Sequence, residues 1–261
     1  MNQPSKILKQ KARTVLMGKY IPSVSTMITM LALSALLSWL LDMSGFSLAG
    51  DTFQKICYVV MNIVILLLEG LLGIGLTYFF LQMALGKPFA GRMLFYCFTH
   101  DPDRFILAAA LRGSLILLGW LPALICYYAL PVFAEASADQ ILLLLFLLLL
   151  AVLLNLPVRL YFGQSNYILL EDLECGVLES MKRSASLVQG HKARLFFLYL
   201  SFVGYNLLEI GTFGAGALWI QPYLEMVQVQ FYLNLTGRDP LAEDAEDAII
   251  YPDDPNSSFE E

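Results

Sequence analysis

The stretch ILLLLFLLLLAVLLNLPVRLYF, residues 141–162, decides the class of this protein. Only Asn155 and Arg159 interrupt its apolar character with a polar or charged side chain. About 20 apolar residues in a helix suffice to cross the hydrocarbon core of a bilayer. The whole chain agrees with this interpretation, because 58% of its residues are hydrophobic and 15% are charged, against about a quarter charged in a soluble domain. We therefore predict an all-α integral membrane protein.

Three similar apolar stretches precede this one, at about 21–41, 56–85 and 105–130, so residues 21–162 are predicted to form four transmembrane helices. A last apolar block, 195–235, has twice the length that one crossing needs. The glycine-rich GTFGAG at 211–216 falls inside it and indicates a tight turn. We predict a transmembrane hairpin there and six crossings in all. One long crossing with an outer C-terminus is the alternative.

Lysine and arginine counts in the short loops indicate the orientation. The N-terminal segment carries five, the loop at 86–104 three and the segment 163–194 four, whereas the two intervening loops share only Lys55. Basic loops stay in the cytoplasm. The N-terminus is therefore predicted to be cytoplasmic, in a cell membrane. Residues 1–20 are expected to form a basic amphipathic helix on the anionic membrane surface.

The segment 163–194 has a different pattern, with buried-type residues at three- and four-residue spacing. They are Leu170, Leu173, Val177, Met181, Ser184 and Val188. This spacing predicts a cytoplasmic amphipathic helix over about 171–190, with Gly190 at its C-terminus in a left-handed conformation. After the last crossing, residues 236–261 are acidic and are expected to be disordered, because nine acids and one base follow from Arg238 onward.

Three ionisable residues stand out inside the predicted crossings: Glu69, Arg112 and Glu225. A charge at this depth normally faces a partner or a wet cavity. Arg112 lies seven residues past Phe105, roughly 10 Å from the inner edge, and Glu225 lies roughly 15 Å from the same edge. Those depths allow an ion pair between the third and sixth crossings, with Glu69 placed higher. This intramembrane polar cluster is either a structural ion pair or the lining of a pathway.

The sequence shows no pattern typical of catalysis. Phosphate-binding loops, zinc-protease motifs and nucleophile elbows are absent from it. THDPDR at 99–104 does not indicate a metal site, because Pro102 interrupts it and no second cluster of ligand residues supports it. The four cysteines form no C-x-x-C pair, so we expect free thiols, although Cys57 and Cys126 both lie near the outer face, where a bridge could form. We expect no catalytic, cofactor or metal residue and no nucleic-acid partner, and we do not expect an enzyme.

Three C-terminal segments resemble a known family: YFGQSNYILLED (161–172), ESMKRSASLVQGHKARLFFLYLSFVGYNLL (179–208) and GAGALWIQPYLEMVQVQFY (214–232). Together they are similar to the bacterial integral-membrane family of domain of unknown function 975. The matching motif residues are Ser184, Gly190, Gly204, Gly214, Gly216, Trp219, Pro222, Tyr223, Phe231 and Tyr232. Tyr205 departs from it, since a tryptophan is expected there. The resemblance implies a bacterial cytoplasmic membrane protein and transfers no reaction or cofactor.

The cytoplasmic segments are too short for a catalytic domain. We therefore expect a non-enzymatic membrane protein that acts on the lipid bilayer or through a membrane protein partner or homo-oligomer, as an accessory component. The 171–190 helix and the acidic tail would be its interaction surfaces. The alternative is a transporter of a small solute or lipid that uses Arg112 and Glu225.

Overall fold

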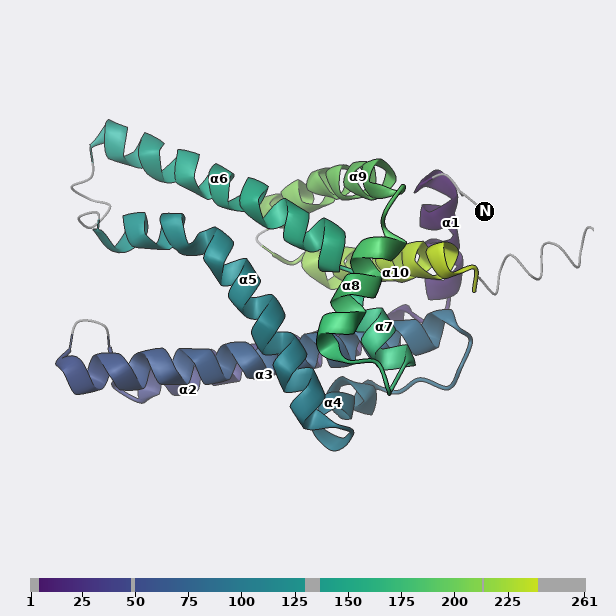
Figure 1. The fold of residues 1–261 in the computed structure, drawn as a ribbon, viewed down its shortest axis with the longest axis horizontal. Coiled ribbons are helices and arrows are strands. Elements are labelled where there is room, and N and C mark those ends of the chain that lie inside the picture. Colours follow the sequence, from purple (N-terminus) through teal and green to yellow (C-terminus); the bar gives the residue numbers. More distant parts are fainter. Residues whose placement is uncertain (1–4, 48–49, 130–136, 213, 239–261) are drawn as a thin grey trace, which may run out of the picture.

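The computed structural model describes residues 5–47, 50–129, 137–212 and 214–238, and the predicted acidic tail lies outside these ranges from residue 239 onward. In chain order the elements are α1 (Ser5–Leu16), α2 (Tyr20–Met43), α3 (Thr52–Ala84), the 3₁₀ helix η1 (Gly91–Phe95), α4 (Tyr96–Thr99), α5 (Pro102–Ala129), α6 (Ala138–Phe162), α7 (Ser165–Glu171), α8 (Val177–Leu187), α9 (Lys192–Gly211) and α10 (Ala217–Thr236). The described part contains helices and turns but no strand (Figure 1). The predicted all-α class is confirmed for it.

Four of the described helices are long and apolar enough to cross a membrane: α2, α3, α5, and α6 together with α7. Large apolar side chains on them are exposed, for example Phe53 at 68%, Leu118 at 66% and Leu142 at 63%. Soluble monomers rarely expose apolar surface on this scale. The four apolar helices predicted over 21–162 are therefore present, and they suggest a membrane location. α9 and α10, each of 20 residues, are long enough but are not among the helices apolar enough to cross a membrane.

The packed core lies at one end of the molecule and is centred on α10. That helix is buried along most of its second half and packs against α1, α2, α3 and α9. The second half of α3, from Leu71 to Ala84, is buried in the same place, whereas its first half is largely exposed. From this end the α2–α3 pair and the α5–α6 pair diverge (Figure 1). The core thus sits at the end that carries the basic loops.

Close contact between α3 and η1 depends on a glycine. A Cβ atom at Gly75 would collide with the backbone carbonyl of Leu94, whereas Gly73 has open space beside it. The backbone of η1 therefore rests directly on α3, which only a residue without a side chain allows.

The N-terminal amphipathic helix is present as α1, but most of its apolar face packs on protein. Leu8, Ala12 and Leu16 are fully buried in the core, against α10. The basic side chains add contacts on the protein, with Arg13 5.5 Å above the ring of Tyr223. The expectation of an apolar face in the membrane surface is wrong, because periodicity identifies an apolar face but not what covers it.

The amphipathic helix predicted over about 171–190 is shorter in the structure, since the chain turns between α7 and α8. The carboxylate of Asp172 accepts hydrogen bonds from the backbone N–H groups of Glu174 and Cys175, at 3.1 and 3.2 Å, which ends α7. Leu173, predicted on the buried stripe, is 56% exposed in this turn. The φ angle of +88° at Gly190 confirms the predicted left-handed conformation.

The helix break predicted in GTFGAG is confirmed. α9 ends at Gly211, α10 begins at Ala217, and Gly214 has a φ angle of +85°. All four cysteines are free, and Cys57 and Cys126 form no bridge.

Candidate binding chamber between α3, α5, α6, α9 and α10

The three predicted intramembrane residues do come together. Glu69 of α3, Arg112 of α5 and Glu225 of α10 line one cavity of about 390 Å³. The wall between α3 and α5 is close-packed beside it, because a Cβ atom on Gly70 would overlap that of Ala109. α7 closes another side through Tyr167. The predicted cluster is therefore the lining of a cavity.

A second cavity of about 610 Å³ adjoins the first, between α5, α6, α9 and α10. Ile116, Glu225 and Gln228 line both cavities, so the two share a wall. Arg159 of α6 and Glu209 of α9 line the second cavity only. We call the two cavities together the chamber.

The ion pair between Arg112 and Glu225, one of the two alternatives that the sequence left open, is absent from the described residues. Within the described part of the chain, no ion pair or hydrogen bond joins these two side chains. Their charges nevertheless act on each other, and the charge of Arg159 acts on both. Arg112 and Glu225 lie at similar depths along their helices, as the sequence predicted. The cavity between α5 and α10 nevertheless keeps the two side chains apart. Two guanidinium groups, those of Arg112 and Arg159, thus lie at this part of the chamber without an ion pair to Glu225 in the described residues.

The other end of the chamber is acidic. Both carboxylate oxygens of Glu209 accept hydrogen bonds from the side-chain amide of Gln221, at 2.8 and 3.0 Å. Gln221, Glu225 and Gln228 follow at four- and three-residue spacing, so they lie on one face of α10. Gln228 accepts a hydrogen bond from the hydroxyl of Tyr199 at 3.4 Å. One face of α10 thus connects the acidic end to the arginine end.

Sequence reasoning missed Arg159 and Glu209 as lining residues. Arg159 stood near the inner edge of its predicted crossing, where a basic residue is ordinary. Glu209 lies within the apolar block 195–235, close to its predicted turn. A search for every ionisable residue inside the predicted crossings would have found both. Their meeting depends on how α6 and α9 pack.

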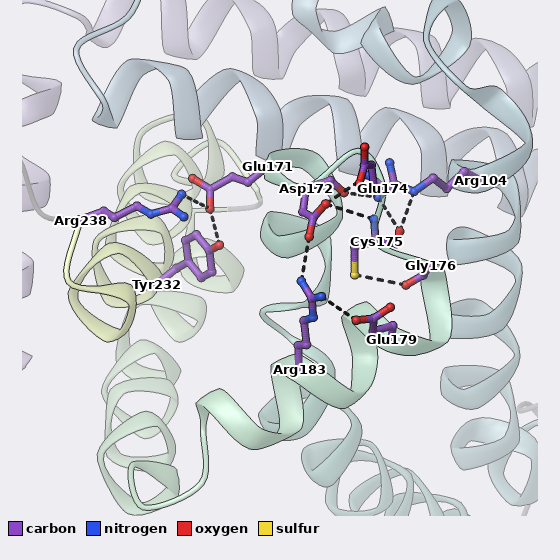
Figure 2. A network of polar contacts seen from close by, with 10 residues as sticks. All are labelled: Arg104, Glu171, Asp172, Glu174, Cys175, Gly176, Glu179, Arg183, Tyr232 and Arg238. Carbon is purple, nitrogen blue, oxygen red and sulfur yellow. Dashed lines mark hydrogen bonds and ion pairs between the residues drawn. The ribbon is translucent and has the colours of Figure 1, made fainter.

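A polar network holds the α7–α8 turn against the beginning of α5 (Figure 2). Arg104 donates hydrogen bonds to the carbonyl of Cys175, at 2.7 and 3.0 Å, and to the carbonyl of Asp172. Arg183 pairs with the carboxylates of Asp172 at 2.7 Å and Glu179 at 2.6 Å. The hydrogen bond from Arg183 lowers the pKa of the Asp172 carboxyl. The network positions α7, which forms part of the chamber wall.

A second contact of this network ties α7 to the end of α10 (Figure 2). The carboxylate of Glu171 accepts a hydrogen bond from the hydroxyl of Tyr232 and pairs with Arg238 at 3.0 Å. The ring of Tyr232 stacks on that of Tyr167, with centroids 4.8 Å apart. Gly237, with a φ angle of +71°, ends α10 beside this contact. The orientation of α10 in the chamber is thus held from its C-terminal end.

The motif residues of the family resemblance serve mainly to pack α8, α9 and α10. The hydroxyl of Ser184 is buried and donates to the carbonyl of Tyr161 at 2.7 Å, which joins α8 to α6. Phe231 is buried beneath the guanidinium of Arg194, 5.2 Å from its ring centroid. Trp219, in contrast, is 60% exposed. The motif therefore surrounds the chamber without forming its charged lining.

These features define an all-helical protein with four helices of membrane-crossing length and a charged chamber beside its core. The family model described as "Protein of unknown function (DUF975)" matches residues 1–239. The chain belongs to this family. No curated protein and no solved structure matches it.

Proposed function

We propose that this protein is a six-crossing protein of the bacterial cytoplasmic membrane, with its N-terminus inside, that binds a polar ligand or lipid headgroup in the chamber without catalysing a reaction. One observation carries the proposal: five ionisable side chains line two adjoining cavities, and Arg112 and Glu225 form no ion pair there.

Physical cost supports ligand binding. A charge placed deep in a bilayer costs roughly 2.5–3.5 kcal/mol or more on insertion scales. Side chains that carry such a cost usually have a function in binding or conduction. A structural role would be served by a direct ion pair between Arg112 and Glu225, and the lining of an open cavity serves that role poorly.

The six crossings are supported by the geometry of α9 and α10. Each has 20 residues, a length of about 30 Å, which matches the hydrocarbon core. Their low apolarity has a physical reason, because the polar face of α10 with Gln221, Glu225 and Gln228 is directed at the chamber and not at lipid. The break between Gly211 and Ala217 argues against one long crossing.

The topology is tested by labelling with a membrane-impermeant maleimide in intact cells, after Cys57 and Cys126 are replaced by serine. Thr212→Cys, at the α9–α10 turn, should be labelled from outside. Ser186→Cys, on α8, should be labelled only after the cells are made permeable. A Thr212→Cys variant that resists labelling under both conditions would favour one long crossing.

Binding is tested by native mass spectrometry of the protein extracted gently from its own membrane. The wild type should retain a small molecule or lipid that is lost in Arg112→Gln and in Glu225→Gln. Arg92→Gln is the matched control, because Arg92 is exposed on η1 outside the chamber. Equal retention by all variants would refute binding in the chamber. A stoichiometric protein partner would instead favour an accessory role, with α8 and the acidic tail as its contact surfaces.

Transport is the second candidate. It is favoured because the two cavities adjoin at Glu225 and Gln228 and together extend along one face of α10. Uptake or lipid transfer by proteoliposomes that is lost in Glu225→Gln would favour transport over binding alone.

A further inference from the structure

The chamber separates its charges along α10. Gln221 marks the level of Glu209, and Gln228 marks the level of Tyr199. The hydroxyl of Tyr199 lies beside Gly163, which contacts the carbonyl of Arg159 and lines the smaller cavity with Arg112. Seven residues between these two positions correspond to roughly 10 Å along the helix. The two ends are therefore distinct subsites, connected by Glu225.

The acidic end suits an ammonium group. The carboxylate of Glu209 is held in place by Gln221, yet two carboxylate oxygens offer about four acceptor positions and the amide uses only part of them. Trp120 lines the same cavity, and an indole face attracts a cation that lies against it. A primary amine can donate several hydrogen bonds at such a site, whereas a quaternary ammonium can donate none.

The arginine end suits an anion. Arg112 and Arg159 both line the chamber, and in the described part of the chain neither guanidinium forms an ion pair with Glu225 or Glu69. A guanidinium presents a planar fork of donors that matches a phosphate or a carboxylate.

The rim of the larger cavity is apolar and exposed. Val152 of α6 and Val203 of α9 line it and are 55% and 48% exposed. These residues lie on helices with exposed apolar faces, so a molecule dissolved in the bilayer can enter between α6 and α9. A lipid is the source that this rim favours.

We propose that the chamber binds a zwitterion, with its primary amine at Glu209 and its phosphate or carboxylate at Arg159 and Arg112. This inference rests on the proposed function and names its ligand class. An aminophospholipid and a free amino-phosphate or amino acid share this chemistry.

The test is native mass spectrometry of the delipidated full chain, titrated with four probes. Phosphatidylethanolamine carries both charges, phosphatidylglycerol lacks the amine, phosphatidylcholine lacks the N–H donors, and glycerophosphoethanolamine lacks the acyl chains. Phosphatidylethanolamine should bind roughly tenfold more tightly than phosphatidylglycerol and phosphatidylcholine, which is the value of one hydrogen bond to a charged group. Strong binding of glycerophosphoethanolamine would identify the free zwitterion as the source.

Two variants separate this inference from the proposed function. Glu209→Gln should reduce binding of phosphatidylethanolamine to that of phosphatidylglycerol, and Arg159→Gln should weaken both lipids, with Arg92→Gln unchanged. Equal wild-type binding of the three lipids, weakened by Arg159→Gln, would overturn the zwitterion and leave the proposed function standing. Binding that responds to neither Arg159→Gln nor Arg112→Gln would overturn both. The comparison of the three lipids on the wild-type protein needs no variant, so it tests the zwitterion proposal even if Glu209→Gln fails to fold.

Discussion

Replacing Gly75 by alanine should destabilise the protein strongly, because the new methyl group would meet backbone. The nearest atoms to a Cβ at this position are the carbonyl oxygen, carbonyl carbon and Cα of Leu94 in η1. A flexible side chain could move away, but here the whole η1 backbone must shift from α3. Overpacking of this kind costs about 3 kcal/mol. For a chain of this size that corresponds to a fall in Tm of about 6–12 °C.

Gly73→Ala is the matched control, two residues away on the same helix. Nothing lies within 4 Å of a Cβ atom placed there. Alanine is about 0.8–1 kcal/mol more favourable than glycine inside a helix, so Tm should rise by about 2–4 °C. Thermal unfolding of both purified variants in the same detergent measures the difference. Equal Tm values for Gly75→Ala and Gly73→Ala would refute the direct contact between η1 and α3.

Two further predictions concern α8. The hydrogen bond from Arg183 lowers the pKa of the Asp172 carboxyl in the folded state. The ionised carboxylate therefore stabilises the fold at pH values above the pKa of an unfolded aspartate, about 3.9. This stabilisation is lost as the pH falls through the lower pKa of the folded state. Thermal unfolding between pH 7 and pH 3 should therefore show a smaller loss of Tm in Arg183→Gln than in the wild type, and parallel curves would contradict this. Ser184→Ala should lower the stability by about 1 kcal/mol, since it removes a buried bond to the carbonyl of Tyr161, while Ser186→Ala, an exposed site, should not. Identical Tm values in these two variants would show that the bond to α6 contributes nothing.

Local signals account for what could be predicted about the fold. The apolar lengths over 21–162 correspond to α2, α3, α5 and α6, because a helix that faces lipid needs an apolar surface along its whole length. Gly190 and Gly214 have positive φ angles where turns were expected, because glycine adopts them without steric cost.

Predictions of what covers an apolar helix face, and of where a helix is interrupted, were less successful than predictions of the helices themselves. The apolar stripe of α1 packs on α10, although its basic residues are equally typical of a helix on a membrane surface. The apolar spacing from Leu170 to Val177 continues across the turn between α7 and α8. Apolar spacing carries no information about the hydrogen bonds that the Asp172 carboxylate accepts within this turn. Both failures concern contacts that depend on other parts of the chain or on turn geometry.

The candidate site lies between these cases. Glu69, Arg112 and Glu225 could be selected from the sequence, because a charge in an apolar stretch is costly wherever the helix packs. Whether these side chains form an ion pair or line a cavity could not be predicted, since both arrangements require the same residues at the same depths. Arg159 and Glu209 joined the chamber only through the packing of α6 on α5 and of α9 on α10.

The sequence by itself determined an all-helical chain with four membrane-length helices, a membership in one family and a few charges in apolar surroundings. These properties follow from composition and from the local geometry of the backbone, which act over a few turns of helix. Only the tertiary structure decided that α1 covers α10, that α7 and α8 are separate, and that five charges surround a chamber without a direct ion pair between Arg112 and Glu225. Distances between helices depend on how side chains far apart in the chain pack together, and no local pattern contains that information.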